Sequence, residues 1–208
     1  MFQENFYIIN SNFSQSSGFA EKRNYGNHEG VDYTSKEFKK QNIYNLFTGQ
    51  VSNFGQAQMP GNYVILRHNF KFIRGEDDYF YTAYKHLSKI DILVNFRHEA
   101  NLKNNIINPG EIIGKMGNTG YSLTRDKNKW RELTDIEKSD PLETRGVHLH
   151  LETFQFTSNN RMTPLLQKFI NSGWVKENDR NCYFYDFGKL FINPDLLMSY
   201  ARLLLVGE

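Results

Sequence analysis

The chain has 208 residues, of which 39% are hydrophobic and 15% aromatic, so it is long enough to bury a core and is predicted to form one domain spanning residues 1–208. A net charge of +2, with lysine and arginine dispersed along the chain, excludes the strongly basic patches typical of proteins that bind nucleic acid. The one cysteine, Cys182, excludes an internal disulfide and a structural zinc site built from cysteines.

Neither a membrane span nor a secretory leader is predicted. The longest apolar run, Leu203 to Val206, is far shorter than the roughly 20 residues needed to cross a bilayer. Residues 1–10 contain no basic leader and no apolar core of seven residues, so they do not match a signal peptide.

The first polar motif is Asn27-His28-Glu29-Gly30-Val31-Asp32, in which an imidazole and a carboxylate stand four residues apart. On an extended strand the side chains of His28 and Asp32 would lie about 13 Å apart, too far to bind one ion. We therefore expect the backbone to curl, which Gly30 permits. Taken alone, this pattern fits a polar surface loop better than a metal site.

Most of the predicted elements are strands. Apolar and β-branched runs predict strands at 64–66, 79–84, 111–114 and 147–156, and stretches rich in Gly and Asn predict turns at 53–61 and 116–120. Helices are predicted only at 164–170 and after Asn193, where Pro194 takes the first helical position and an apolar stripe follows, formed by Leu196, Leu197, Tyr200, Leu203 and Leu204. The predicted fold class is β-rich (α+β), with few peripheral helices.

The last predicted strand contains the most informative motif, Gly146-Val147-His148-Leu149-His150-Leu151-Glu152. Side chains alternate along a strand, so His148, His150 and Glu152 share one face, at about 7 Å per pair, while Leu149 and Leu151 face the other way. Histidines at this spacing are too far apart to be equal ligands of one zinc ion, which binds nitrogen at about 2.0–2.1 Å. We expect one to bind and the other to stand beside the ion. The alternative is a strand with two solvent-facing histidines.

Together the two motifs offer a catalytic ligand set. His28, Asp32 and one of His148 or His150 supply three nitrogen and oxygen ligands and leave a fourth position open to water. Catalytic zinc has this arrangement, whereas structural zinc is normally closed by four ligands. The residues alone do not choose between His148 and His150.

A third histidine lies in Tyr84-Lys85-His86-Leu87, and with it the chain resembles the zinc endopeptidases of the lysostaphin and LytM type, which cut peptide cross-links in bacterial cell walls. That family has an H-x3-D motif, an internal histidine before a leucine, and a terminal H-x-H strand followed by Glu. Further segments resemble the family pattern in the same order, at 49–51, 61–68, 108–114, 117–120 and 191–194. The resemblance covers about residues 25–156.

The resemblance implies an antiparallel β-sheet core that carries a Zn²⁺ site in a groove. It implies that His28, Asp32 and His150 bind the zinc and that His148 is the general base. His86 would orient the attacking water or stabilise the oxyanion. Glu152 is expected to accept a hydrogen bond from a ligating histidine, and a simple exposed carboxylate is the alternative.

The implied function is a zinc-dependent endopeptidase that acts on peptidoglycan peptides outside the cytoplasm. The alternative is a non-catalytic module of the same fold that binds cell wall or regulates another hydrolase. Such relatives tend to lose ligand residues, and all five positions are filled here, which favours the enzyme. Two stretches, at about 121–145 and 157–189, are predicted insertions relative to the family pattern. They are expected to affect which substrates the protein accepts, and not its metal binding.

Other residues near the motifs receive simpler interpretations. His68 is expected to pack or to form a hydrogen bond rather than to act in catalysis, and His98 to lie on the surface. No pattern supports Cys182 as a nucleophile. Tyr25 and Asn118 are candidates for contacts with substrate.

Overall fold

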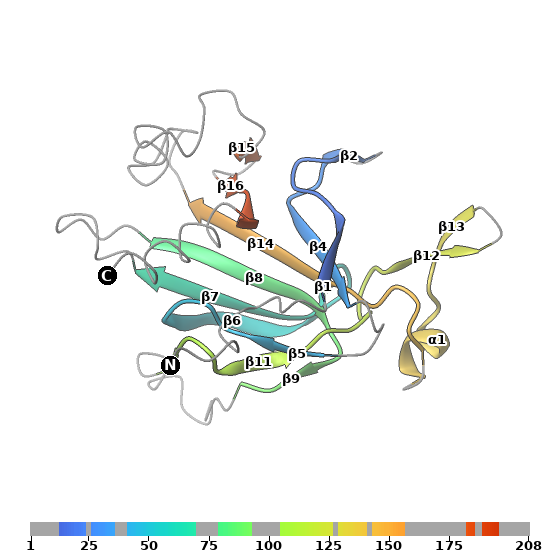
Figure 1. The fold of residues 1–208 in the computed structure, drawn as a ribbon, viewed down its shortest axis with the longest axis horizontal. Coiled ribbons are helices and arrows are strands. Elements are labelled where there is room, and N and C mark those ends of the chain that lie inside the picture. The colour runs from blue at the N-terminus through green and yellow to red at the C-terminus, as the bar shows by residue number, and fades with distance from the viewer. Residues whose placement is uncertain are drawn as a thin grey trace.

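The computed structural model describes residues 13–23, 26–35, 41–69, 79–92, 105–126, 129–140, 143–156, 182–185 and 189–195. In these ranges the chain is mostly antiparallel strand, and α1 (Asp135–Ser139) is a short helix at one end of the molecule (Figure 1). The predicted β-rich class is therefore confirmed. No helix within the described ranges is long and apolar enough to span a bilayer.

A nine-stranded sheet forms the body of the molecule. Its strands in chain order are β1 (Phe13–Ser17), β4 (Gly30–Ser35), β6 (Gly49–Ala57), β7 (Gly61–Asn69), β8 (Tyr79–Leu87), β10 (Ile106–Ile107), β14 (Leu149–Phe156), β15 (Cys182–Tyr185) and β16 (Lys189–Ile192). Across the sheet the order is β1-β4-β14-β8-β7-β6-β10, while β16 pairs with β14 and β15.

Three smaller sheets surround this body. A three-stranded sheet contains β5 (Asn42–Tyr44), β11 (Ile112–Lys115) and β9 (Lys89–Ile90). Two hairpins are formed by β2 (Lys22–Arg23) with β3 (Gly26–Asn27) and by β12 (Leu123–Asp126) with β13 (Lys129–Glu132).

Side-chain alternation gives the large sheet two unlike faces. One face packs on the hydrophobic core, where Val64, Leu66, Tyr84, Leu149 and Leu151 are at most 2% exposed. The opposite face of β14 carries His150 and Glu152, which are also buried. The predicted division of this strand into an apolar face and a histidine face is therefore confirmed.

Strand β14 lies between the two strands that carry the other motifs (Figure 1). His150 pairs with Asp32 of β4 on one side and with Lys85 of β8 on the other. Directly paired residues have Cβ atoms about 4.5–5.5 Å apart. This register brings the H-x3-D and H-x-H motifs together, although 118 positions separate Asp32 from His150.

Gly30 serves close packing rather than the curl predicted from the sequence. It pairs with Glu152 and does not adopt a positive φ. A Cβ at this position would overlap the backbone carbonyl of Leu151 and would lie 3.1 Å from Glu152 Cγ. The bend that aims His28 at Asp32 lies before β4, between the β2–β3 hairpin and Gly30.

Several predicted boundaries were wrong. The strands predicted at 64–66 and 79–84 are longer in the structure, at Gly61–Asn69 and Tyr79–Leu87. Residues 53–57, predicted as part of a turn, continue β6, and the turn occupies only 58–60. Their backbones pair with residues 61–65 of β7, so ladder hydrogen bonds outweigh the weak strand propensity of Asn and Gly. Strand β14 begins at Leu149 rather than at residue 147, because His148 forms only an isolated bridge to Gly117.

The stretch 121–145, where no element was predicted, contains the β12–β13 hairpin and α1. Thr134 and Glu137 form a capping box at the start of α1, and the T-x-x-E pattern was the available signal in the sequence. Glu137 also forms ion pairs with Arg131 of β13 and with Arg145. Arg145 lies shortly before His148 in the chain. The helix is thereby tied to the hairpin and to the segment that leads into β14.

The predicted helix at 164–170 lies outside the described residues. At the other predicted helix, Asn193 Oδ1 accepts a hydrogen bond from the Asp195 backbone N–H at 3.0 Å, as expected of a capping residue. The apolar stripe predicted to follow lies outside the described ranges.

The close approach at Gly30 generates a first prediction. We expect Gly30→Ala to lower the free energy of unfolding by about 1–3 kcal/mol, because the added methyl group must push β4 away from β14. Denaturant unfolding measures this loss. Gly18→Ala is the control, since a Cβ there would meet only the end of the Gln15 side chain, at 3.1 Å. Equal stability of the two variants would contradict the packing argument.

Candidate metal centre

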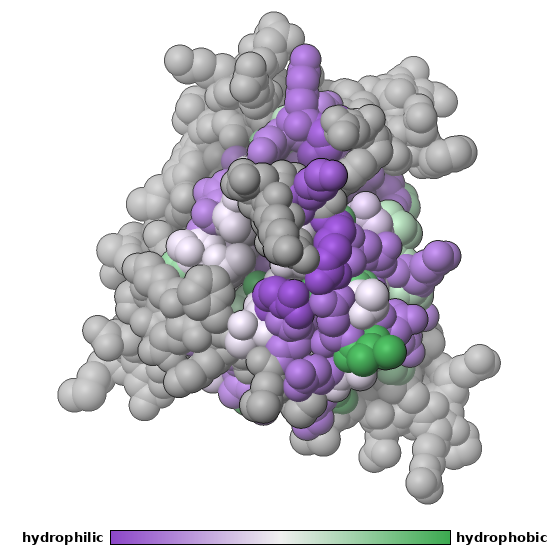
Figure 2. Space-filling model, turned by 90° about the vertical axis from the view of Figure 1, so that its right-hand side faces the viewer, coloured by the Kyte–Doolittle hydropathy of each residue, from purple (hydrophilic) through white to green (hydrophobic). Residues whose placement is uncertain are grey.

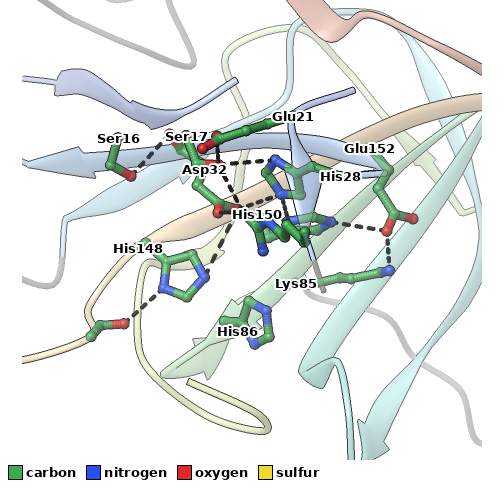
Figure 3. Close-up of polar contacts among 12 residues, drawn as sticks. Ser16, Ser17, Glu21, His28, Asp32, Lys85, His86, His148, His150 and Glu152 are labelled. Atoms are coloured by element: carbon green, nitrogen blue, oxygen red, sulfur yellow. Dashed lines mark hydrogen bonds and ion pairs between the residues drawn. The ribbon is translucent and has the colours of Figure 1, made fainter. Parts of the chain in front are cut away.

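His28, Asp32 and His150 meet on the sheet face opposite the core (Figure 3). Asp32 Oδ1 lies 3.1 Å from His28 Nε2 and 2.7 Å from His150 Nδ1. The two nitrogens are 3.0 Å apart. All three side chains are buried, and together they could hold a metal ion.

The three atoms fit a zinc ion. Ligands of a tetrahedral ion with bonds of about 2.0–2.1 Å lie about 3.3–3.4 Å from one another. The observed separations of 2.7–3.1 Å would have to open by only a fraction of an ångström. Two imidazoles and one carboxylate are also a donor set that suits zinc.

Hydrogen bonds on the outer side of both imidazoles aim their inner nitrogens at the centre. His28 Nδ1 lies 2.8 Å from the carbonyl oxygen of Gly18, and His150 Nε2 lies 3.0 Å from Glu152 Oε1. Because these oxygens can only accept, the nitrogens beside them carry the protons. The lone pairs of His28 Nε2 and His150 Nδ1 therefore face Asp32 Oδ1, as metal binding requires.

His86 and His148 stand beside this cluster, with ring centroids 4.6 Å apart. His148 Nε2 lies 4.0 Å from Asp32 Oδ1. His86 Nδ1 is 2.8 Å from the Thr119 carbonyl oxygen, and His148 Nδ1 is 2.7 Å from that of Gly146. By the same reasoning, Nε2 of each neutral ring is a proton acceptor.

The local environment keeps these two rings neutral. Burial lowers the pKa of His148, and burial together with the nearby His148 and His150 rings lowers the pKa of His86 well below its ordinary value. Asp32 behaves in the opposite way. Burial raises its pKa, but the close His150 and His28 rings outweigh burial and hold the pKa well below the usual range. The centre thus combines an ionised carboxylate with imidazoles that can accept a proton.

An unusual backbone conformation aims His86 at the centre. Alternation from Thr82 and Tyr84 would place His86 on the core face of β8. A β-bulge sets Lys85 and His86 opposite the single residue Tyr63, and His86 adopts a φ of 61°. This left-handed conformation, normally taken by Gly in such bulges, turns the imidazole to the face of His150. The His86 N–H donates to the Pro60 carbonyl at 2.8 Å and helps to hold the bend.

Glu152 is buried on the same face and contacts His150. It accepts the His150 Nε2 hydrogen bond and forms an ion pair with Lys85 (Figure 3). Burial raises the pKa of Glu152, but the Lys85 charge and the His150 hydrogen bond outweigh it and leave the pKa low. Glu29 shows the opposite shift, because burial and the neighbouring Glu152 both raise its pKa.

Comparison with known families and structures agrees with this geometry. The profile of peptidase family M23 matches residues 26–162, and this span contains all five residues of the centre. The chain belongs to peptidase family M23. The resemblance noted in the sequence is thereby confirmed. No curated protein matches the sequence significantly.

Several solved structures are similar to this chain. A putative glycyl-glycine endopeptidase LytM from Ruminococcus gnavus is 18% identical, over 93% of this chain and 56% of its own, with a TM-score of 0.50. Lysostaphin from Staphylococcus simulans is 20% identical over 86% of this chain and 61% of its own, with a TM-score of 0.46. A zinc-containing peptidase from Vibrio cholerae is 23% identical over 72% of this chain, with a TM-score of 0.45. This chain spans only 36% of the V. cholerae structure.

Sequence reasoning placed the five motif residues together but missed their neighbours. Arg23 forms an ion pair with Asp32 at 2.7 Å, and Lys85 forms one with Glu152. The Gly18 carbonyl fixes the His28 ring. Arg23 and Gly18 lie outside the M23 motifs, so no motif pointed to them. Lys85 lies opposite His150, and predicting this contact requires the strand register, which the sequence does not give.

The remaining candidates lie away from the centre or outside the described residues. Asn118 is buried and donates from Nδ2 to the Arg145 carbonyl at 3.2 Å, so it braces the segment before His148. Tyr25 and His98 lie outside the described residues, and Cys182 is described only as part of the β15 backbone.

His68 lies on the core face and is 1% exposed. Its Nδ1 is 3.1 Å from the Thr48 carbonyl, its Nε2 is 2.8 Å from Thr82 Oγ1, and its ring stacks on Phe80. The interpretation of His68 as a packing residue is therefore confirmed. Burial lowers its pKa from 6.5 to about 4.

This shift makes stability depend on pH. The unfolded chain takes up a proton at His68 between pH 6.5 and about 4, whereas the folded chain does not, so acidification through this window favours unfolding. We expect wild type to lose up to about 3 kcal/mol more unfolding free energy than His68→Gln over this range. Denaturant unfolding at several pH values measures the difference. Parallel pH curves would contradict the burial of a neutral His68.

At His86, the stability cost of the strained backbone can be separated from the cost of losing the imidazole. Both His86→Ala and His86→Gly remove the imidazole, but only glycine adopts a φ of 61° without a steric cost. We expect the glycine variant to be the more stable by about 1–2 kcal/mol. At Lys85, which has no positive φ, the order should reverse, with alanine the more stable. Denaturant unfolding of the four variants checks both orders.

Proposed function

We propose that this M23 protein is a zinc-dependent endopeptidase that hydrolyses peptide bonds of bacterial peptidoglycan. The observation that carries the proposal is the convergence of three buried ligand atoms, within 3.1 Å of one another, beside two neutral imidazoles that are not needed as ligands. A purely structural metal site has no need of additional proton acceptors.

His28, Asp32 and His150 would hold the metal through Nε2, Oδ1 and Nδ1. Among the described residues, three protein atoms converge, which leaves one position for water or substrate, as in catalytic zinc sites. A zinc ion bound there would polarise the scissile carbonyl and lower the pKa of a water molecule toward neutrality. Glu152, held by Lys85, would keep the His150 ring oriented through Nε2.

His148 is proposed as the general base. Its Nδ1–H is committed to the Gly146 carbonyl, and its low pKa keeps Nε2 free to accept a proton. His148 Nε2 would take a proton from the attacking water. Once protonated, the same nitrogen would donate that proton to the amine of the leaving peptide.

His86 is proposed to orient the attacking water. The resemblance implied either this role or stabilisation of the oxyanion. Because His86 Nδ1–H donates to the Thr119 carbonyl, Nε2 of the neutral ring has no hydrogen to offer an oxyanion. A water molecule can donate a hydrogen bond to that nitrogen, which supports the first role.

Peptidoglycan as substrate, and action outside the cytoplasm, are proposed from the family. The molecular surface is compatible with a polar peptide. Figure 2 shows the side of the molecule where β2, β12, β13 and α1 lie, and its described residues are predominantly hydrophilic.

Three alanine variants separate metal binding from chemistry. We expect wild type to bind one equivalent of zinc, and His28→Ala and Asp32→Ala to lose it because each removes one of three ligands. His148→Ala should retain zinc but lose at least about 100-fold in hydrolysis, since a general base contributes about 10²–10⁴-fold. Elemental analysis gives the metal content, and digestion of purified cell wall gives the activity.

His68→Gln is the matched control, since His68 lies on the opposite face of the sheet and should affect neither readout. Loss of zinc in His148→Ala would refute the assigned roles. A wild type that binds cell wall but neither binds zinc nor digests the wall would be a non-catalytic module of the same fold.

A further inference from the structure

Residues 13–23 precede the segment that matches family M23, yet they contact the centre. Strand β1 pairs with β4 on the side away from β14, and Ser17 is the register partner of Asp32. The turn after β1 leads into β2, which ends at Arg23. This segment therefore flanks Asp32 from the outside.

Arg23 is held against Asp32 by a chain of hydrogen bonds. Its Nη2 donates to Asp32 Oδ2 at 2.7 Å and to Ser17 Oγ at 2.8 Å. Ser17 Oγ in turn donates to Glu21 Oε2 at 2.5 Å (Figure 3). The side chains of Arg23 and Asp32 are only 26% and 11% exposed, so this charge-assisted bond is shielded from solvent.

The two oxygens of Asp32 consequently have separate partners. Oδ1 faces His28 Nε2 and His150 Nδ1, whereas Oδ2 faces Arg23. A free carboxylate can bind a metal ion through one oxygen or through both. With Oδ2 bound to the guanidinium, only Oδ1 remains for the ion.

We propose that Arg23 is a positioning residue that keeps Asp32 a single-oxygen metal ligand and so preserves the open coordination position. The inference rests on the proposed function in that His28, Asp32 and His150 must bind a metal. Arg23 also adds positive charge beside ligands whose net charge is −1. This charge opposes binding of a dication but favours negative charge that develops on a scissile carbonyl.

The test uses Co²⁺ in place of Zn²⁺, because the visible absorption of Co²⁺ weakens when a four-coordinate site gains a ligand. In Arg23→Ala the freed Oδ2 should join the ion, and the absorption should fall relative to wild type. Metal affinity, measured by competition with a chromophoric chelator, should stay the same or rise. Hydrolysis of cell wall at saturating Zn²⁺ should fall about 10- to 100-fold.

Three further variants serve as controls for Arg23→Ala. Lys22→Ala, an exposed neighbour on β2, should match wild type in spectrum, affinity and rate. Arg23→Lys keeps the charge and should restore part of the absorption. Arg23→Met keeps the length of the side chain without a donor, so it replaces Arg23→Ala if circular dichroism shows that the alanine variant does not fold.

An unchanged Co²⁺ spectrum in the folded Arg23 variants would overturn the inference. If metal binding also weakens while the spectrum stays unchanged, Arg23 only holds the ligands together. A wild type that binds no Co²⁺ or Zn²⁺ contradicts the proposed function instead, and the two failures are therefore distinguishable.

Discussion

The register of β14 between β4 and β8 is the constraint on which the centre depends. It pairs His150 with Asp32 and with Lys85, and it pairs Glu152 with Gly30. A slip of one residue would exchange the two faces of β14, burying His150 in the core and turning Leu149 and Leu151 outward. Because those leucines are almost fully buried, the hydrophobic core fixes the register, and the register in turn fixes the metal ligands.

The centre keeps a dense set of buried polar groups because each imidazole has a partner on its outer side. The partners are the carbonyl oxygens of Gly18, Thr119 and Gly146 and the carboxylate of Glu152. An unpaired buried polar group would cost about 1–3 kcal/mol. The same bonds set the tautomers, so one set of contacts both stabilises the fold and prepares the rings for metal binding or proton transfer.

Elements outside the common M23 motifs complete this arrangement. On one side, β1 and β2 bring Ser17 and Arg23 against Asp32. On the other, α1 and the β12–β13 hairpin connect through Glu137 to Arg145, in the segment that precedes His148. The family motifs thus supply the reacting groups, while segments outside those motifs hold the carboxylate ligand and the residues that lead into the H-x-H strand.

Sequence alone determined the β-rich fold, the family, and the residues that meet at the centre, because alternation and motif spacing are local properties of the chain. It also predicted that Leu149 and Leu151 face away from His150. Only the tertiary structure decided how His86 reaches the centre, since a bulge and a φ of 61° reverse the side chosen by alternation. The same is true of Arg23 and Lys85, whose partners Asp32 and Glu152 come from neighbouring strands and depend on pairing that no local pattern encodes.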